Sequence, residues 1–329
     1  MRTSGRIVSR RTVWLSGIAT GAALLGKPAS GLHEPGHLLQ IVVSFAPGGQ
    51  TDAVARILAK GIDVATGHPV VVENKPGGGG RVGAAFVQDQ RPDGSVVLLS
   101  PSALLAISPL LNPDFARNLA DNFRPVAGVA EFDYAIAVAM DSPMKSLPEL
   151  VKRAREVGKD LMWGVVGGGA LAQLVAGLLG MAIDVKLSLV PYSNSNDVVI
   201  ALLGGQVPVV IVETATIAKQ HAEGRVRVLA TTGKARSPLL PEVKTVEEQG
   251  IRLEAVNHLG VFAPAGTPND IVKTISDAIV EAVSNPEVRN GLERLGAQAS
   301  GQATSQFAET YARDQRLWTE AIVQLGLKP

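Results

Sequence analysis

Residues 42–52 read Val-Val-Ser-Phe-Ala-Pro-Gly-Gly-Gln-Thr-Asp, which is typical of a buried strand that turns directly into a helix. The β-branched and aromatic residues favour the strand, and Pro47 is expected to end it because proline has no N–H for a ladder. The two glycines permit conformations that other residues avoid, and Thr51 or Asp52 is expected to cap the helix. Unpaired N–H groups at a helix start attract anions. The stretch is therefore either a carboxylate-binding loop or an ordinary connection, and these residues alone favour neither.

The next part of the chain alternates strands and helices, as in a parallel α/β layer. Strands are expected at 70–72 and 96–99, with a helix over 81–88 between them. A second strand–glycine–helix junction lies at 161–173. The two glycine-rich junctions predict two α/β lobes that face each other. The tail after residue 267 is predicted to be helical, and its aromatic and aliphatic side chains are expected on one buried face: Phe307, Tyr311, Trp318 and Ile322.

The composition excludes several classes of function. The chain has 329 residues, 46% of them hydrophobic, with a formal net charge of +1 and no long basic run, which argues against nucleic acid as a partner. It has no Cys, so disulfides and Cys-ligated metals are excluded. His33-Glu34-Pro35-Gly36-His37 matches the letters of a zinc-protease motif, but Pro35 and Gly36 break the helix that this motif needs. We expect no metal and no cofactor.

Residues 1–30 are predicted to be a secretory signal peptide, because a basic start is followed by a short apolar segment and small residues. Arg10 and Arg11 precede the apolar segment, as in a twin-arginine signal; the general secretory route is the alternative. The apolar segment is too short and too rich in Gly for a confident membrane span. Without Cys there is no lipid anchor, so the mature protein is expected to be free in the periplasm.

Residues 78–83 also match the dinucleotide-binding pattern GxGxxG between a strand and a helix. Four consecutive glycines satisfy many patterns, and the acidic residue that such a site needs is missing, since the next strand ends in Ser100. An exported Rossmann-type oxidoreductase is therefore the alternative function. A cofactor that stays bound during purification would favour it.

Taken together, these stretches resemble the solute-binding receptors of tripartite tricarboxylate transporters, the Bug (TctC-like) family. The matching motifs are FAPGGQTDAVAR at 45–56, VENKPGGGGRVG at 72–83, RPDGSVVLLS at 91–100, VPY at 190–192, LLGGQV at 202–207, RVLATT at 227–232 and APAGTP at 263–268. They follow the family's order and cover nearly all of the mature chain.

The resemblance implies a type II periplasmic binding-protein fold, with two α/β lobes joined by two crossovers and a ligand cleft between them. Lobe 1 is expected to comprise residues 31–130 and 256–329, and lobe 2 residues 131–255. The implied function is capture of a small carboxylic acid, such as a di- or tricarboxylate, an amino acid or an aromatic acid. The protein is expected to be a monomer and not an enzyme, and to deliver its ligand to the permease subunits of such a transporter. A ligand sensor for a signalling partner is an alternative that the sequence does not separate.

The ligand-binding residues that this resemblance implies come from both lobes. They are Phe45, Ala46, Gly48, Gly49, Gln50, Thr51, Asp52, Ser100, Ser102, Gly167, Gly168, Gly169, Ala170, Tyr192, Glu213 and His258. In lobe 2 the sequence departs from the family pattern, which is close to GSxGxGSxxH. Val165, Ala170 and Gln173 stand at its two Ser positions and its His position. The distal end of the ligand is therefore expected to be less polar than usual, or to be held only by backbone amides.

Overall fold

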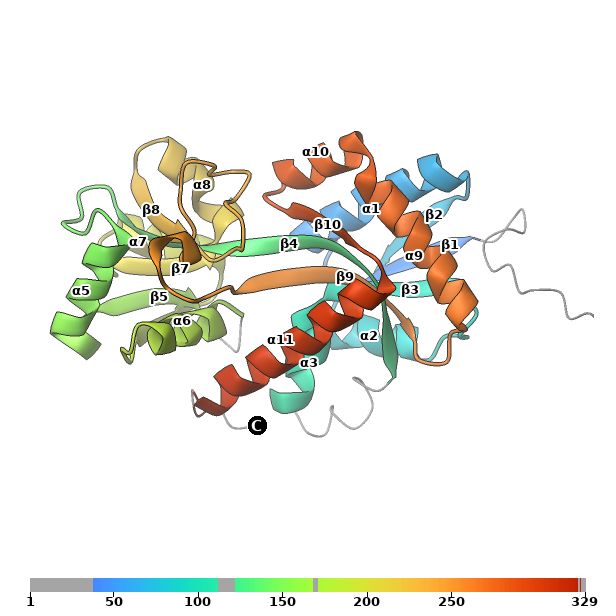
Figure 1. Ribbon diagram of the computed structural model, residues 1–329, viewed down its shortest axis with the longest axis horizontal. Coiled ribbons are helices and arrows are strands. Elements are labelled where there is room, and N and C mark those ends of the chain that lie inside the picture. Colours follow the sequence, from blue (N-terminus) through green and yellow to red (C-terminus); the bar gives the residue numbers. More distant parts are fainter. Residues whose placement is uncertain (1–37, 112–121, 168–170, 325, 327–329) are drawn as a thin grey trace, which may run out of the picture.

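The computed structural model describes residues 38–111, 122–167, 171–324 and 326. Within them the chain forms two α/β lobes that lie side by side along the long axis of the molecule (Figure 1). We call the lobe that holds the first strands of the chain lobe 1, on the right in Figure 1, and the other one lobe 2.

Lobe 1 is built on a sheet with the strand order β2-β1-β3-β9-β4. Its strands are β1 (Leu39–Val43), β2 (Val70–Asn74), β3 (Val96–Pro101), β9 (Val256–Pro264), the first part of β4 (Phe123–Ala139), and β10 (Gln298–Gln302), which pairs with β4. Its helices are α1 (Gln50–Thr66), η1 (Gly78–Gly80), α2 (Arg81–Gln88), α3 (Ser102–Leu111), α9 (Asn269–Ser284) and α10 (Pro286–Arg294). The strands β1, β2 and β3 are parallel, so their carboxyl ends lie at one edge.

Lobe 2 repeats this plan around the order β4-β7-β5-β6, with β8 also paired to β4. Its strands are β5 (Met162–Val166), β6 (Ser188–Tyr192), β7 (Val209–Glu213) and β8 (Val226–Thr231). Its helices are α5 (Leu147–Val157), η2 (Gly158–Asp160), α6 (Leu171–Ala182), α7 (Ser195–Leu203), α8 (Thr214–Ala222) and η3 (Glu247–Gln249). Here β7, β5 and β6 are parallel.

Two strands carry the chain between the lobes. The long strand β4 pairs with β9 as far as Asp133 and with β7 from Tyr134 onward, so it changes partner at this point. The chain returns through β9. The lobe boundaries expected at residues 130 and 255 stay a prediction.

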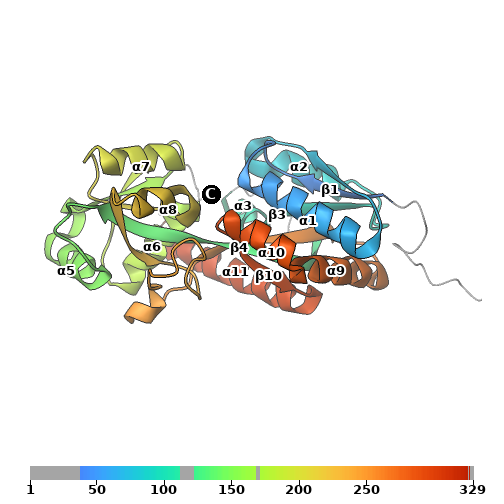
Figure 2. The ribbon, with the colours of Figure 1, turned by 90° about the horizontal axis from the view of Figure 1, so that it is seen from above.

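The last helix, α11 (Thr304–Gln324), also spans both lobes. It packs against α3 in lobe 1, along β4, and against α6 in lobe 2. Figure 1 shows it running beneath the crossover strands, and Figure 2 shows it on one side of them. The expected apolar face is confirmed, because Phe307, Tyr311, Trp318 and Ile322 are all buried. Helix α11 thus packs on lobe 1 and also reaches α6 of lobe 2.

Local sequence signals account for most of the element limits. Ser146 caps α5 and Asn285 caps α10 through their side-chain oxygens. The N-cap of α1 is Gly49, not Thr51 or Asp52, so this helix begins earlier than expected. The apolar strand expected from Tyr134 is the second half of β4, which tolerates Pro125 next to an irregularity in its register.

Candidate functional site

The β1–α1 connection is a tight, exposed turn closed by its own residues. Gly48 has φ +80, in the left-handed region that favours glycine, and its N–H donates to Asp52 Oδ2 at 2.9 Å. The Gly49 N–H donates to Ala46 O at 3.4 Å. Phe45 anchors the start of the turn, because its ring packs on the lobe 1 core and its carbonyl accepts a bond from Asn74 Nδ2 at 3.1 Å.

Asp52 holds this turn from below through contacts with Gly48 and Arg56. Its side chain is only 5% exposed, and Arg56 contacts both of its oxygens at 3.0 Å. The hydrogen bond from Arg56 lowers the pKa of Asp52 to about 2, against the opposing effect of burial, and the Gly48 N–H adds to the lowering. The carboxylate is thus ionised and neutralised within the protein. In this structure the carboxylate braces the turn, and a contact with the ligand stays a prediction.

What the turn offers outward is a set of backbone donors. Ala53 is the first residue whose N–H bonds within the helix, to Gly49 O at 3.0 Å. The N–H groups of Gln50, Thr51 and Asp52 precede it, in the helix turn whose donors have no intrahelical partner. Because Ala46, Gly48 and Gly49 are exposed, a carboxylate can approach these donors closely.

The glycines of the GxGxxG-like stretch are required by packing. A Cβ on Gly80 would lie 2.8 Å from a methyl carbon of Leu104, and one on Gly83 would lie 2.8 Å from the Cα of Ser44. These residues let η1 and α2 lie against the end of β1. The packing accounts for these glycines without a dinucleotide.

The two serines and the histidine expected at the ligand lie inside the protein instead. Ser100 is fully buried, and Ser102 at the start of α3 donates its hydroxyl to Asp314 Oδ2. His258 on β9 is 4% exposed, and its Nδ1 lies 2.9 Å from the same Asp314 oxygen. The ring is enclosed by residues of β4, β9 and α11, and a place for His258 at the ligand stays a prediction.

The other ring nitrogen of His258 is also occupied. Arg313 Nη2 lies 3.4 Å from Nε2, and Glu131 Oε1 lies 3.8 Å from it. In the neutral ring, Nδ1–H donates to Asp314 and Nε2 accepts from Arg313. Because Ser102 and His258 bind one carboxylate oxygen side by side, they do not form the Ser–His–acid chain of a hydrolase. The cluster instead ties α3, β9 and α11 together between the lobes.

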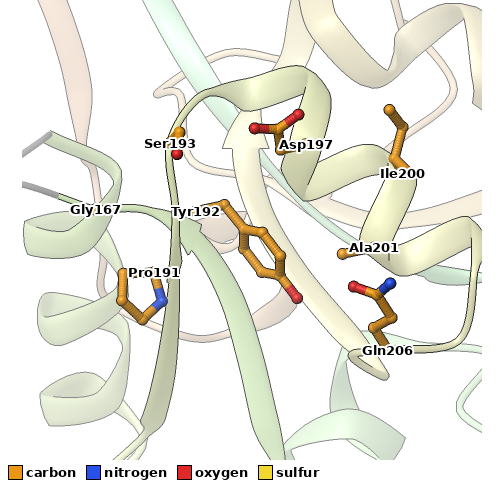
Figure 3. Close-up of a pocket in the computed structure, with 8 residues that line it drawn as sticks. All are labelled: Gly167, Pro191, Tyr192, Ser193, Asp197, Ile200, Ala201 and Gln206. Carbon is orange, nitrogen blue, oxygen red and sulfur yellow. The ribbon is translucent and has the colours of Figure 1, made fainter.

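In lobe 2, Tyr192 lines a cavity of about 600 Å³ beside the edge strand β6 (Figure 3). The tyrosine ring points toward Gln206 and Ala201, which close the cavity from the α7 side. Gly164 of β5 lies beneath this cavity, and a Cβ there would be only 3.0 Å from a methyl carbon of Val207. Gly167 is likewise needed because a Cβ would lie 2.5 Å from that of Pro191. Gly168, Gly169 and Ala170 lie outside the described residues.

Glu213 ends β7 and is the residue before α8. Its side chain does not cap α8; its Oε2 accepts a bond of 2.7 Å from Ser195 Oγ, at the first residue of α7. Its charge is felt by Tyr134, whose pKa is raised by burial and further by this carboxylate. Of the lobe 2 residues expected at the ligand, Glu213 is the described one that carries a formal charge.

The loops of the two lobes meet through a short chain of contacts. Gln50 Nε2 lies 3.5 Å from Leu295 O, and the next residue, Gly296, approaches Ala215 so closely that a Cβ would be 2.9 Å from the alanine Cβ. Gln298 of β10 donates to the carbonyl of Ala235 in lobe 2 at 3.2 Å. The start of α1 and the start of α8 therefore lie on facing sides of the lobes.

Comparisons with known proteins agree with this architecture. Residues 54–327 match the family described as tripartite tricarboxylate transporter family receptor, TctC. The chain belongs to this family. A UPF0065 protein from the tcbD–tcbE intergenic region of Pseudomonas sp. (strain P51) is 32% identical, over 97% of this chain and 96% of the relative.

Two solved structures of similar proteins contain dicarboxylates. MatC from Rhodopseudomonas palustris with bound malate is 28% identical, covers 88% of this chain and 100% of its own, and has a TM-score of 0.69. A second R. palustris protein, with adipate, is 25% identical, covers 90% of this chain and 99% of its own, and has a TM-score of 0.73. Similar structures include a periplasmic binding protein, which confirms the fold class that the resemblance implies.

As a receptor-family member, the chain is a solute-binding protein of a kind that acts by binding rather than by catalysis. Within the described part of the chain, no helix is long and apolar enough to cross a membrane. The same residues contain no group of three or more His, Asp or Glu side chains suited to a metal ion. The HEPGH segment and the predicted signal peptide lie outside the described residues.

Arg56, Asp314 and Gln298 were not predicted from the sequence. Arg56 could have been predicted to contact Asp52, because it stands four residues after it in a helix. Asp314, by contrast, lies 212 residues from Ser102. Gln298 belongs to β10, a strand of polar residues that carries no apolar alternation.

Proposed function

We propose that this chain is an extracytoplasmic receptor that binds a small carboxylic acid between its lobes and delivers it to the permease subunits of a tripartite tricarboxylate-type transporter. Family membership supports the receptor role. The malate and adipate in similar solved structures support an acid as the ligand. Export through a twin-arginine signal in residues 1–30, and a monomeric state, are parts of the same proposal.

The observation that carries the proposal is the braced turn at the start of α1. The backbone N–H groups at the start of α1 are held in place by this turn, which Asp52 braces through Gly48 while Arg56 neutralises its charge. A carboxylate at this position gains backbone hydrogen bonds and the positive end of a 17-residue helix. Little reorganisation is needed, because the hydrogen bonds of Gly48 and Gly49 already close the turn.

The first test is a thermal-shift screen of the mature protein against carboxylates and amino acids. A ligand at about a hundred times its dissociation constant should stabilise the protein by about 2.7 kcal/mol. No stabilisation by any acid in the panel would contradict the proposed function.

The second test places the ligand at the turn. Gly49 has φ −78 and its Cβ would have only an ordinary contact, 3.4 Å from Ala46 O, so Gly49→Val should fold. The valine should abolish binding because it blocks close approach to the backbone. Gly266→Val is the matched control, since its Cβ would also lie 3.4 Å from its nearest atom, on Pro92. It follows β9 at the opposite edge of the sheet. If Gly49→Val binds like the parent protein, the ligand is held elsewhere.

A further inference from the structure

Glu213 points to the chemical class of the ligand. We propose that the ligand carries a protonated amine in addition to its carboxylate, and that Glu213 selects for this amine. The inference rests on the proposed function and concerns the lobe 2 side of the same site.

The first step is the position of Glu213. It stands at the carboxyl end of β7, where ligands of parallel α/β sheets bind. The contact between Gly296 and Ala215 brings the start of α8 against lobe 1, next to the residue that Gln50 contacts. In Figure 2, α7 and α8 lie toward lobe 1, whereas α5 lies at the far end of lobe 2. Glu213 thus faces the same interlobe region as the carboxylate-binding turn.

The second step is the charge of the lobe 2 wall. Among the described residues, the segments at the carboxyl ends of β6 and β7 are 191–197 and 213–218, and they contain Asp197 and Glu213 but no Lys or Arg. The Asp197 carboxylate is bound by Asn194 Nδ2 at 2.8 Å, and Glu213 is bound by the neutral Ser195 hydroxyl. Neither contact removes the negative charge. This wall of the cleft is therefore acidic.

The third step is a buried carboxyl group behind the wall. Asp133 on β4 is 4% exposed and lies against the hydroxyl of Thr214, the residue after Glu213. The side chains near it that affect its pKa are the neutral hydroxyl groups of Thr214, Ser237 and Thr231, so no cation compensates its charge when it is ionised.

The helix starts near Glu213 explain why a second carboxylate on the ligand is disfavoured there. A carboxylate at the starts of α7 and α8 is favourable, and in this protein Glu213 itself occupies that place. A second carboxylate on the ligand would be repelled, because the Glu213 carboxylate already lies at this favourable position. An ammonium group would instead gain a charge-assisted hydrogen bond to Glu213. The chain would thus differ from its relatives with malate and adipate in the charge at the distal end of the ligand.

The test compares ligands of equal length that differ in one group. Calorimetry is performed on the mature protein with α-amino acids, with ω-amino acids such as 4-aminobutanoate, and with the dicarboxylates of the same carbon number, such as succinate. At least one amine-bearing acid is expected to bind at least tenfold more tightly than its matched dicarboxylate.

Glu213→Gln then tests the residue itself. The amide can still accept the Ser195 hydrogen bond, so the variant should fold, which circular dichroism and the melting temperature check. The amine-bearing acid should bind about tenfold more weakly or worse, and the dicarboxylate more tightly. Glu223→Gln, at the other end of α8 and paired with Lys219 at 3.8 Å, makes the same charge change and should alter neither affinity.

The outcomes separate this inference from the proposed function. If the parent protein prefers dicarboxylates, or if Glu213→Gln binds the amine-bearing acid unchanged, the inference is overturned while the receptor role stands. If no carboxylate of either kind binds, both are overturned.

Discussion

Replacing Asp52 by Asn should lower both the stability of the protein and its affinity for the ligand. Asn has the same shape but no charge, so the ion pair with Arg56 is lost and the Gly48 N–H keeps only a neutral acceptor. The pKa of Asp52 falls from 3.8 to about 2 in the folded protein. At about 1.36 kcal/mol per pKa unit, this corresponds to at most roughly 2.4 kcal/mol.

Solvent reduces this value, because the Arg56 side chain is 56% exposed. We therefore expect Asp52→Asn to reduce the free energy of unfolding by about 1 kcal/mol at pH 7. Since the folded pKa lies below the unfolded one, the contribution is fully present above the unfolded value of 3.8 and is lost as the pH falls through about 2. The difference in the free energy of unfolding between the parent and Asp52→Asn should therefore shrink in acid.

The assay is urea unfolding of the parent and the variant at pH 7 and at the lowest pH at which both still fold. Asp63→Asn, an exposed position on the same helix, is the control and should change little. Binding should weaken by about tenfold, or 1.4 kcal/mol, because the turn loses its brace. A deficit that is the same at both pH values would refute the assignment to the Asp52 charge. Unchanged binding would refute its role in the turn.

Three further predictions concern other parts of the chain. Burial raises the pKa of Asp133 to about 6, so its protonated form favours the fold below the unfolded value of 3.8, and this advantage is lost as the pH rises through 6. Asp133→Asn should therefore raise the free energy of unfolding at pH 7 by about 1–3 kcal/mol. This free energy, measured by urea unfolding, should also depend less on pH between pH 4 and 7 than in the parent protein. Asp314→Asn should reduce the free energy of unfolding by about 1–3 kcal/mol in the same assay. The control Asp277→Asn, which removes the exposed ion pair with Lys273, should reduce it by about 0.5 kcal/mol or less. Replacing Arg10 and Arg11 by Lys should leave precursor in the cytoplasm, seen by fractionation; normal export would indicate the general secretory route.

The fold could be predicted wherever local chemistry and tertiary packing agree. Val42 and its neighbours are apolar, and the proline and glycines after them permit one kind of turn, so β1 and α1 follow from the sequence. The start of α1 was misplaced because Gly49, which has no capping side chain, takes the N-cap position while Asp52 reaches back to Gly48.

The candidate site was predicted less completely, because it depends on distant residues. Ser102 and His258 have polar side chains next to expected cleft segments, and such residues look like ligand contacts. Both are instead bound to Asp314, which no pattern in the sequence connects to them. Glu213 was expected at the site, but the role inferred for it depends on the Ser195 contact and on the absence of Lys and Arg from the described segments at the ends of β6 and β7.

The course of α11 over both lobes limits how the receptor can open. If β4 and β9 were the only bridges, the lobes could swing and twist about them with little resistance. Because α11 also packs on α6, and Trp318 is fully buried, a wide swing would have to pull this helix from the core or slide it along α6. Packed helices slide by small amounts. The empty receptor should therefore stay near the geometry that binds its ligand, so that less conformational freedom is lost when the ligand arrives.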